Sequence, residues 1–357
     1  MSYDEILAEL RSKLTDDSKA NDTFLRKEAE RFARIGNMDG VKACGNLLVE
    51  NMPEEEVEEI NRIIHLDGET LDVVHRKIVE LIEKHDSIGA KPIAERLYKK
   101  ITVEFKETDK VKFISTRNPF EDNLLQILFK QDKALHRTPF DLASYITTYA
   151  YILTETGSPY DAIPVLKRAI EFNPVDCGPM FELAEVYKLL QNRKRLLEIT
   201  RDTIKVASSP AGLARCYANM GYMLTDSGDY DDASGFYQAS TMMYPHKMIP
   251  YEMRHLSQLK GTPLRQYTSE EIIKIFAKYE MKFGFNPEVV RVASELAIHY
   301  LSDKDIPNAL YALKMTYNMT RDENIKNIIL KYEPQAEKKP PVSEDGNPDI
   351  KITVNNN

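Results

Sequence analysis

The chain has 357 residues with a formal net charge of -8, and hydrophobic residues make up 42% of it. This apolar content is enough for a folded core and excludes a wholly disordered chain. At roughly 150 residues per domain, the length predicts about two globular units or one long repeat array. The sequence has three cysteines, Cys44, Cys177 and Cys216, which lie far apart and contain no CxxC pair. An odd number of cysteines cannot all be paired in disulfides. We therefore expect a reducing compartment rather than a disulfide framework.

Neither the N-terminal segment nor the most apolar stretch of the sequence suggests targeting to a membrane or to the secretory pathway. The first residues, MSYDEILAELRSKL, carry acidic side chains and no long apolar run, unlike a signal or transit peptide. The longest apolar-rich stretch, 124–129, is too short to span a bilayer. We expect a cytoplasmic protein that makes no membrane contact.

The N-terminal part is predicted to be helical in two regions. Residues 1–55 form the first region, and 22–55 agrees with the repeat described below at some offsets only, so a degenerate copy there is left open. Residues 56–140 form the second. It contains three amphipathic helices and, around the polar segment 107–110, two stretches of period-two alternation that predict a β-hairpin. The helices are expected at 57–65, 71–83 and 92–100, and the hairpin at 101–115.

Residues 141–332 contain a repeat of 34 residues. Four units are found, at 143–176, 177–210, 214–247 and 290–323. The residue at position 8 has a small side chain in every unit, and the residue at position 20 has a small side chain in all units but one. The residues at position 8 are Ala150, Ala184, Gly221 and Ala297, and those at position 20 are Ala162, Leu196, Ala233 and Ala309. Small side chains at these places let two antiparallel helices approach closely, while large ones at positions 11 and 24 fill the flanking space.

This pattern resembles the tetratricopeptide repeat (TPR) family. The unit at 214–247 agrees at nearly every marker position, and 143–176 is almost as good. The unit at 177–210 departs at Leu196, Thr200 and Ser208, and the unit at 290–323 lacks the closing proline. The resemblance implies an all-α solenoid of helix pairs. Two helices at 248–289, one beginning with the capping box Thr268-x-x-Glu271, are expected to continue it. Residues 333–357, with several prolines and a triple Asn, predict a disordered tail.

No catalytic or metal-binding motif is found. The sequence lacks phosphate-binding glycine loops, HExxH and GxSxG, and the acidic run at 54–59 lacks calcium-loop spacing and fits a solvated first helical turn. We expect no cofactor, no metal and no enzyme activity. Residues 91–112 carry seven Lys or Arg against four acidic residues, but no Arg-rich recognition helix follows them.

The concave surface of the solenoid is the candidate binding site. In TPR proteins the first helix of each repeat lines this surface at fixed positions. The central units of this chain carry aromatic, acidic and amide side chains at those positions. The predicted groove residues are Thr147, Tyr151, Phe181, Glu182, Glu185, Arg215, Asn219 and Tyr222. Thr147 and Tyr151 stand where carboxylate-clamping members have Lys and Asn, and Glu182 stands where they have another Asn, so that specificity is not transferred. The aromatic and acidic mixture predicts a peptide with a basic residue beside an apolar one.

The resemblance and the groove together predict a non-catalytic scaffold or adaptor that binds a protein or peptide. Two alternatives stay open. The groove residues could pack against the N-terminal helices or the tail and leave no binding surface. The protein could instead be a TPR-containing regulator whose 69–115 region contacts DNA or a signalling partner, although the acidic net charge argues against nucleic acid. Partner identity and oligomeric state are left open.

Overall fold

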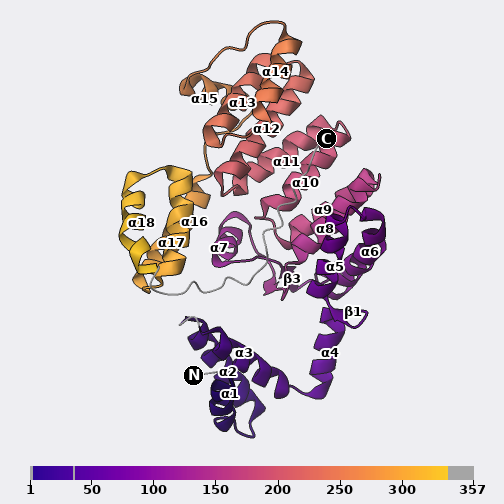
Figure 1. Cartoon of the computed structure of the whole chain (residues 1–357), viewed down its shortest axis with the longest axis vertical. Helices are drawn as coiled ribbons and strands as arrows, with labels where there is room; N and C mark the ends of the chain where they lie inside the picture. Colours follow the sequence, from indigo (N-terminus) through magenta and orange to yellow (C-terminus); the bar gives the residue numbers. More distant parts are fainter. Residues whose placement is uncertain (1–2, 35–36, 337–357) are drawn as a thin grey trace. The chain divides into compact units, whose positions relative to one another are not determined.

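The structure, a computed structural model, describes residues 3–34 and 37–336. The chain divides into two compact units, of which unit 1 ends at Leu71 and unit 2 begins at Asp72. The described residues are mainly helical, with four short strands (Figure 1). The prediction of an all-α fold built from TPR-like helix pairs is confirmed. No described helix has the length and apolarity that a membrane span requires.

Unit 1 begins with three helices that share one core. α1 (Tyr3–Ser12) and α2 (Ser18–Arg34) both pack against α3 (Met38–Glu50). Apolar residues of all three helices make up the core: Ile6, Leu10, Leu25, Phe32, Ala43, Cys44 and Leu47. A helix pair, α2 and α3, therefore spans most of the segment at 22–55 where a degenerate repeat was left open.

Unit 1 ends in a helix and a hairpin that lie outside this core. α4 (Glu54–Ile64) contains no buried residue. It leads into an antiparallel pair of two-residue strands, β1 (His65–Leu66) and β2 (Glu69–Thr70). The turn between them, Asp67-Gly68, has positive φ at both residues, which is the backbone that a tight two-residue hairpin requires and that Gly adopts easily.

Unit 2 begins with α5 (Leu71–Glu83) and α6 (Ser87–Glu104). The hairpin predicted over 101–115 is wrong, because its first half is the last turn of α6. Ile101 and Phe105 are buried and lie four residues apart, as on a helix face, whereas Val103 between them is 70% exposed. The apolar residues at 101–105 therefore follow the period of a helix, about 3.6 residues, and not the period of two that a strand requires.

The second half of the expected hairpin is a strand with a different partner. β3 (Val111–Ile114) pairs in parallel with β4 (Ala134–Arg137), in the register Val111 to Ala134. Parallel strands need a crossover, and here it is provided by α7 (Pro119–Leu128), which begins after the N-cap Asn118. The residue after β3, Ser115, donates a hydrogen bond from its N–H to the carbonyl of Phe172, the last residue of α9 (Pro159–Phe172).

Three helix pairs follow and cover most of the first three expected repeat units, although the third pair begins at residue 210, before the unit expected at 214–247. They are α8 (Leu142–Glu155) with α9 (Pro159–Phe172), α10 (Cys177–Leu189) with α11 (Arg193–Val206), and α12 (Pro210–Ser227) with α13 (Tyr230–Met243). The small residues at positions 8 and 20 are buried where the helices of a pair meet: Ala150, Ala162, Ala184 and Ala233 are at most 1% exposed. α6 packs against α8, at the start of this array.

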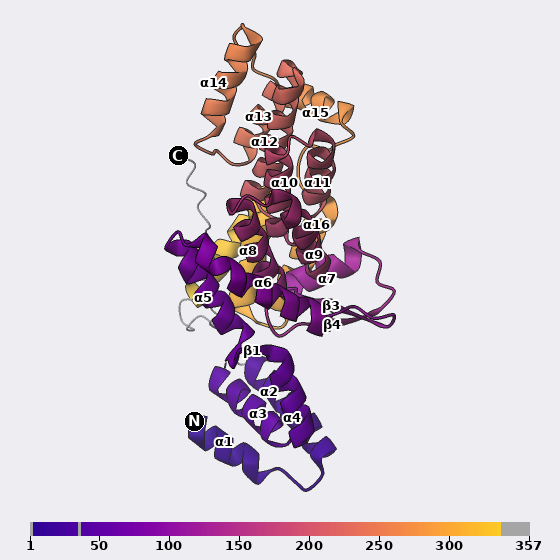
Figure 2. The same cartoon turned by 90° about the vertical axis from the view of Figure 1, so that its right-hand side faces the viewer.

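The next two helices do not form a fourth pair. α14 (Ile249–Lys260) and α15 (Ser269–Lys278) each pack against α13 and lie on different sides of it (Figure 2). The capping box of Thr268 and Glu271 is confirmed. The expectation that these two helices continue the solenoid as a pair is wrong, because each packs mainly against α13 and not against the other.

The last three helices leave the array. α16 (Pro287–Ser302) and α17 (Ile306–Thr320) form a pair that covers most of the unit expected at 290–323 and begins three residues before it, and α18 (Glu323–Ala336) packs against α17. α16 packs against α7 (Figure 1), so the solenoid expected over 141–332 is not continuous. The disordered tail was expected from 333, but 333–336 belong to α18. Residues 337–357 lie outside the described part of the chain.

Candidate functional site

Five of the predicted groove residues lie together, on α10 and α12. The Arg215 guanidinium reaches from α12 to the Glu185 carboxylate of α10, with Nη2 to Oε1 at 3.2 Å, and lies 4.0 Å from Glu182. The same guanidinium stacks on the Phe181 ring, 4.5 Å from its centroid. One turn further along, the Lys188 ammonium binds Glu185 at 3.0 Å and lies 5.4 Å from the centre of the Tyr222 ring.

The two carboxylates of this cluster, Glu182 and Glu185, differ in how well nearby cations balance their negative charge. Burial by itself would raise the pKa of Glu185, but Lys188 and Arg215 outweigh it, and the pKa is lowered. At Glu182 burial dominates over the more distant Arg215, and the pKa is raised. Glu182 is therefore the carboxylate whose negative charge is less well balanced, and a cation placed beside it would be stabilised.

Asn219 lies on α12 between Arg215 and Tyr222, four residues after one and three before the other, so all three share a helix face. It is 2% exposed. Its amide makes no hydrogen bond to any residue in the described ranges, but it is not among the fully buried side-chain atoms that lack a partner, so it keeps some contact with solvent.

The first repeat contributes less than the sequence suggests. Tyr151 on α8 is partly buried, and burial, with the charges of Glu155 and Glu182, raises its pKa; it therefore adjoins the α10 cluster. The Thr147 hydroxyl donates to the Ala143 carbonyl of its own helix at 2.7 Å. The neighbouring Thr148 is buried under α5, where its Oγ1 lies 3.0 Å from His75 Nε2. α5 thus covers part of α8, while Tyr151 stays partly exposed.

The face formed by Tyr151, Phe181, Glu182, Glu185, Arg215, Asn219 and Tyr222 is called the α10–α12 face below. Its charged residues were predicted as free ligands for a basic peptide. In the structure Glu185 is already paired twice, so Glu182, with its single partner at 4.0 Å, is the acidic residue available to a ligand.

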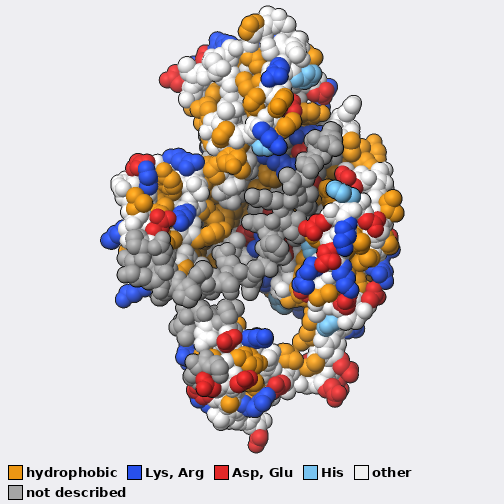
Figure 3. Space-filling model, in the orientation of Figure 1, with side chains coloured by type: hydrophobic (Ala, Val, Ile, Leu, Met, Phe, Trp, Pro, Cys, Tyr) orange, Lys and Arg blue, Asp and Glu red, His pale blue; other side chains and the backbone are white. Residues whose placement is uncertain are grey.

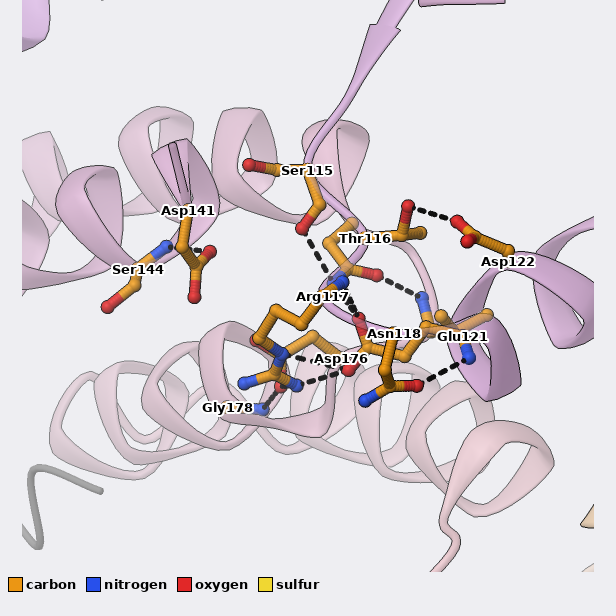
Figure 4. A network of polar contacts seen from close by, with 12 residues as sticks. Ser115, Thr116, Arg117, Asn118, Glu121, Asp122, Asp141, Ser144, Asp176 and Gly178 are labelled. Atoms are coloured by element: carbon orange, nitrogen blue, oxygen red, sulfur yellow. Dashed lines mark hydrogen bonds and ion pairs between the residues drawn. The ribbon is translucent and has the colours of Figure 1, made fainter. Parts of the chain in front are cut away.

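A second polar cluster, which sequence reasoning missed, lies where three helices begin. Arg117, between β3 and α7, donates from Nε and Nη2 to Glu121 Oε1 at 2.8 and 2.6 Å (Figure 4). Its Nη2 also lies 3.2 Å from Asp176 Oδ1. Asn173, fully buried, donates to Glu121 Oε2 at 2.8 Å. We call Arg117, Glu121, Asp141 and Asp176 the Arg117 junction.

Each acid of the Arg117 junction belongs to a helix N-terminus. Asp141 and Asp176 accept hydrogen bonds from the Ser144 and Gly178 N–H groups and cap α8 and α10, while Glu121 lies in the first turn of α7. The sequence did signal the start of α7, because Asn at the N-cap, Pro at the first helical position and Glu in the first turn are typical of helix N-termini. These residues are Asn118, Pro119 and Glu121. What the sequence did not show is that the three starts converge on one arginine.

Burial affects the titration of the junction. Burial by itself would lower the pKa of Arg117, but Asp176 and Glu121 outweigh it, and the pKa is raised. Burial raises the pKa of Asp141 to about 6, against the opposing effects of Arg117 and the Ser144 N–H. Burial, followed by the charge of Asp176, raises the pKa of the Cys177 thiol to about 12, so this thiol is protonated at neutral pH and is a poor nucleophile.

Replacing Asp141 with Asn is expected to stabilise unit 2 at pH 7. The folded state binds the Asp141 proton more tightly than the unfolded state, so this residue's contribution to stability falls as pH rises from about 4 to 6. Asn keeps the helix cap and removes the buried charge. We expect a gain of about 1–3 kcal/mol at pH 7 and none at pH 4 in urea unfolding.

The matched control is Asp305→Asn, because Asp305 caps α17 in the same way, by accepting from the Asn308 N–H. It should change little at either pH. A loss of stability for Asp141→Asn at pH 7 would show instead that attraction to Arg117 outweighs burial.

Metal chemistry finds no support in the arrangement of side chains. Within residues 3–34 and 37–336, no group of three or more His, Cys, Asp or Glu is placed to hold a metal ion. The three cysteines are free thiols, two of them buried.

Comparison with known proteins finds only distant structural likenesses. No protein-family model matches this chain, and neither does any curated protein. Several solved structures match, and two of them are described as TPR proteins. The C-terminal part of a TPR repeat-containing protein from Cytophaga hutchinsonii is 14% identical, with a TM-score of 0.37, over 85% of this chain and 98% of that one. The TPR domain of P58(IPK) is 14% identical, with a TM-score of 0.30, over 89% and 79%.

A third match, the APC/C hetero-tetramer Cut9–Hcn1, is 11% identical with a TM-score of 0.31 and covers 96% of this chain and 62% of the other. Likeness at these levels adds no argument about function. The description of this chain as TPR-like rests on its own helix pairs and on the small residues between them.

Proposed function

We propose that the chain is a non-catalytic scaffold that binds a protein partner through an extended peptide lying on the α10–α12 face. The observation that carries the proposal is Glu182, a carboxylate whose charge is balanced only by Arg215 at 4.0 Å, on a face that also carries aromatic rings. Asn219 on the same face has an amide, which offers a donor and an acceptor together and so matches the N–H and C=O of a peptide backbone.

The surrounding side chains favour a basic residue beside an apolar one in that peptide. Glu182 carries the less compensated negative charge of the face. Tyr222, 38% exposed, and the partly buried Tyr151 supply aromatic surface on either side of it. Aromatic and charged anchors of this kind contribute most of the affinity of small interfaces. A cytoplasmic location stays a prediction.

The regulator alternative, in which 69–115 contacts DNA or a signalling partner, is less well supported. Three lysines of that region have partners within unit 2: Lys91 donates to Thr156, Lys99 pairs with Glu95 and Lys100 pairs with Glu104. A surface that binds DNA neutralises phosphates with unpaired cations. Binding to arbitrary duplex DNA that weakens steeply with salt would support this alternative instead.

The proposal predicts that aromatic surface on the α10–α12 face is required for binding. An array of capped peptides carrying Lys or Arg next to Leu or Phe, with Glu-containing counterparts, is probed with wild type and with Tyr151→Ala/Tyr222→Ala. We expect wild type to select the basic–apolar peptides and the double variant to lose at least about tenfold in affinity.

Tyr160→Ala is the matched control, because Tyr160 is 73% exposed and lies on α9, off this face. It should bind as wild type does. Selection of no peptide, or equal binding by the double variant with unchanged helicity, would contradict the proposed function.

A further inference from the structure

The outer side of α14 is an exposed face on which apolar and basic residues share one helical stripe. Tyr251, Arg254, His255 and Leu259 follow one another at i, i+3, i+4 and i+8, with Lys247 and Met248 just before the helix. Tyr251 is 59%, Leu259 47% and Met248 41% exposed. The opposite stripe, with Ile249 and Leu256, is buried. We call Lys247, Met248, Tyr251, Arg254, His255 and Leu259 the α14 outer face.

This face is uncovered because the array ends there. In a solenoid each repeat is covered by the next, and a terminal repeat presents a polar outer surface. Here α15 packs against α13 and α16 packs against α7, so neither covers α14. Hydrophobic side chains lie beside Lys, Arg and His at this end of unit 2 (Figure 3).

The cations of the α14 outer face are not engaged. Lys247 and His255 make no hydrogen bond or ion pair with the described residues, and Arg254 only stacks on the Tyr251 ring, 5.6 Å from its centroid. The face therefore combines exposed apolar area with unbalanced positive charge. A complementary partner is apolar and acidic.

α4 is a helix with both properties, an apolar stripe and acidic side chains beside it. Val57, Ile60 and Ile64 form an apolar stripe at i, i+3 and i+7, beside five glutamates within 54–59. No residue of α4 is buried, and α4 contributes nothing to the core of α1–α3. A helix of 11 residues is marginal in water by itself, and an amphipathic one is normally stabilised by packing its apolar stripe.

We propose that α4 of one copy of this chain binds the α14 outer face of a second copy. The apolar stripe of α4 would lie against Met248, Tyr251 and Leu259, and its glutamates would pair with Lys247 and Arg254. The binding mode is a helix laid on an apolar surface, with anchors at i, i+3 and i+7. Because the two surfaces differ, the contact is head-to-tail and links copies into a ring or a chain.

The test is the mass of the full-length protein in solution. Sedimentation is measured from about 1 to 100 µM, at ionic strengths of about 0.05 and 0.5 M. We expect the mean mass to rise above that of the monomer with concentration, and to fall back at the higher salt. Lys247→Glu/Arg254→Glu should weaken association at least about tenfold, and so should Glu56→Lys/Glu58→Lys.

Two further variants make the test specific. Combining the two charge reversals in one chain should restore association. Lys167→Glu/Lys194→Glu, which makes the same change in net charge on exposed residues of α9 and α11, should associate as wild type does. A monomeric mass for wild type under all conditions, a Lys247→Glu/Arg254→Glu variant that associates normally, or a combined variant that stays monomeric would each overturn the proposal.

Discussion

Replacing Arg117 with Ala is expected to destabilise unit 2 by roughly 2–4 kcal/mol. The substitution leaves Glu121 and Asp176, whose side chains are only 8% and 12% exposed, without their cation. Removing one partner of a buried ion pair is costly because the remaining charge stays desolvated. The lower part of the usual range applies, since Arg117 itself is 46% exposed. Urea unfolding followed by far-UV circular dichroism measures the loss.

The same variant should loosen the C-terminal helices. The Arg117 junction holds the first turn of α7, and α16 packs against α7, so amide hydrogen exchange in α16 should rise before that in α12. Arg195→Ala is the control, because Arg195 and Glu198 form an exposed pair on α11 and its loss should cost well under about 1 kcal/mol. Equal effects of the two substitutions would show that the Arg117 junction contributes no special stability.

Replacing Gly221 with Ala should destabilise unit 2 by about 1–3 kcal/mol, although Ala is the better helix former. Gly221 lies in α12, and a Cβ there would be 2.8–2.9 Å from three carbons of the Tyr237 ring on α13. The ring is only 1% exposed, so it is packed inside the protein and cannot turn out into solvent without disturbing its neighbours. The steric cost should therefore exceed the gain in helix propensity. Chemical denaturation compares the variant with wild type.

A second substitution tests this cause. Two other helix pairs carry Ala and Leu at the corresponding places, as in Ala150 with Leu166, both buried. Gly221→Ala/Tyr237→Leu should therefore be more stable than the two single changes predict, by at least about 1 kcal/mol. Gly45→Ala in α3, where nothing lies within 4 Å of the added Cβ, should stabilise unit 1. Strict additivity of the two changes would contradict the account of the α12–α13 crossing.

The sequence predicted the helix pairs because their packing is local. Small residues at positions 8 and 20 lie within one unit of 34 residues, and their spacing encodes the crossing directly. The hairpin expected over 101–115 failed for a related reason, since period two and period 3.6 agree over a few residues. Leu97, Ile101 and Phe105, all buried, decide for the helix only when the window extends back to residue 97.

Contacts between distant segments could not be predicted in this way. Nothing in the segment at 290–323 indicates that α16 packs against α7 rather than continuing the array. The Arg117 junction joins residues from 117 to 176, and each of its acids looks like an ordinary helix cap in the sequence. The real hairpin at 65–70 was in reach, because Asp67-Gly68 is the dipeptide that such a turn prefers.

For the candidate site, residue types and helix positions were predictable, but ion pairing was not. The sequence offered Glu182 and Glu185 as equivalent ligands, whereas the structure pairs Glu185 with both Lys188 and Arg215. Which carboxylate keeps an unbalanced charge depends on side-chain geometry between α10 and α12.

The most direct test of peptide binding on the α10–α12 face is a calorimetric titration. The best basic–apolar peptide from the array is titrated into wild type, Tyr160→Ala and Tyr151→Ala/Tyr222→Ala, at matched helicity. We expect wild type and Tyr160→Ala to bind alike and the double variant to bind at least about tenfold more weakly. Equal affinity for all three would contradict the assignment of this face as the binding surface.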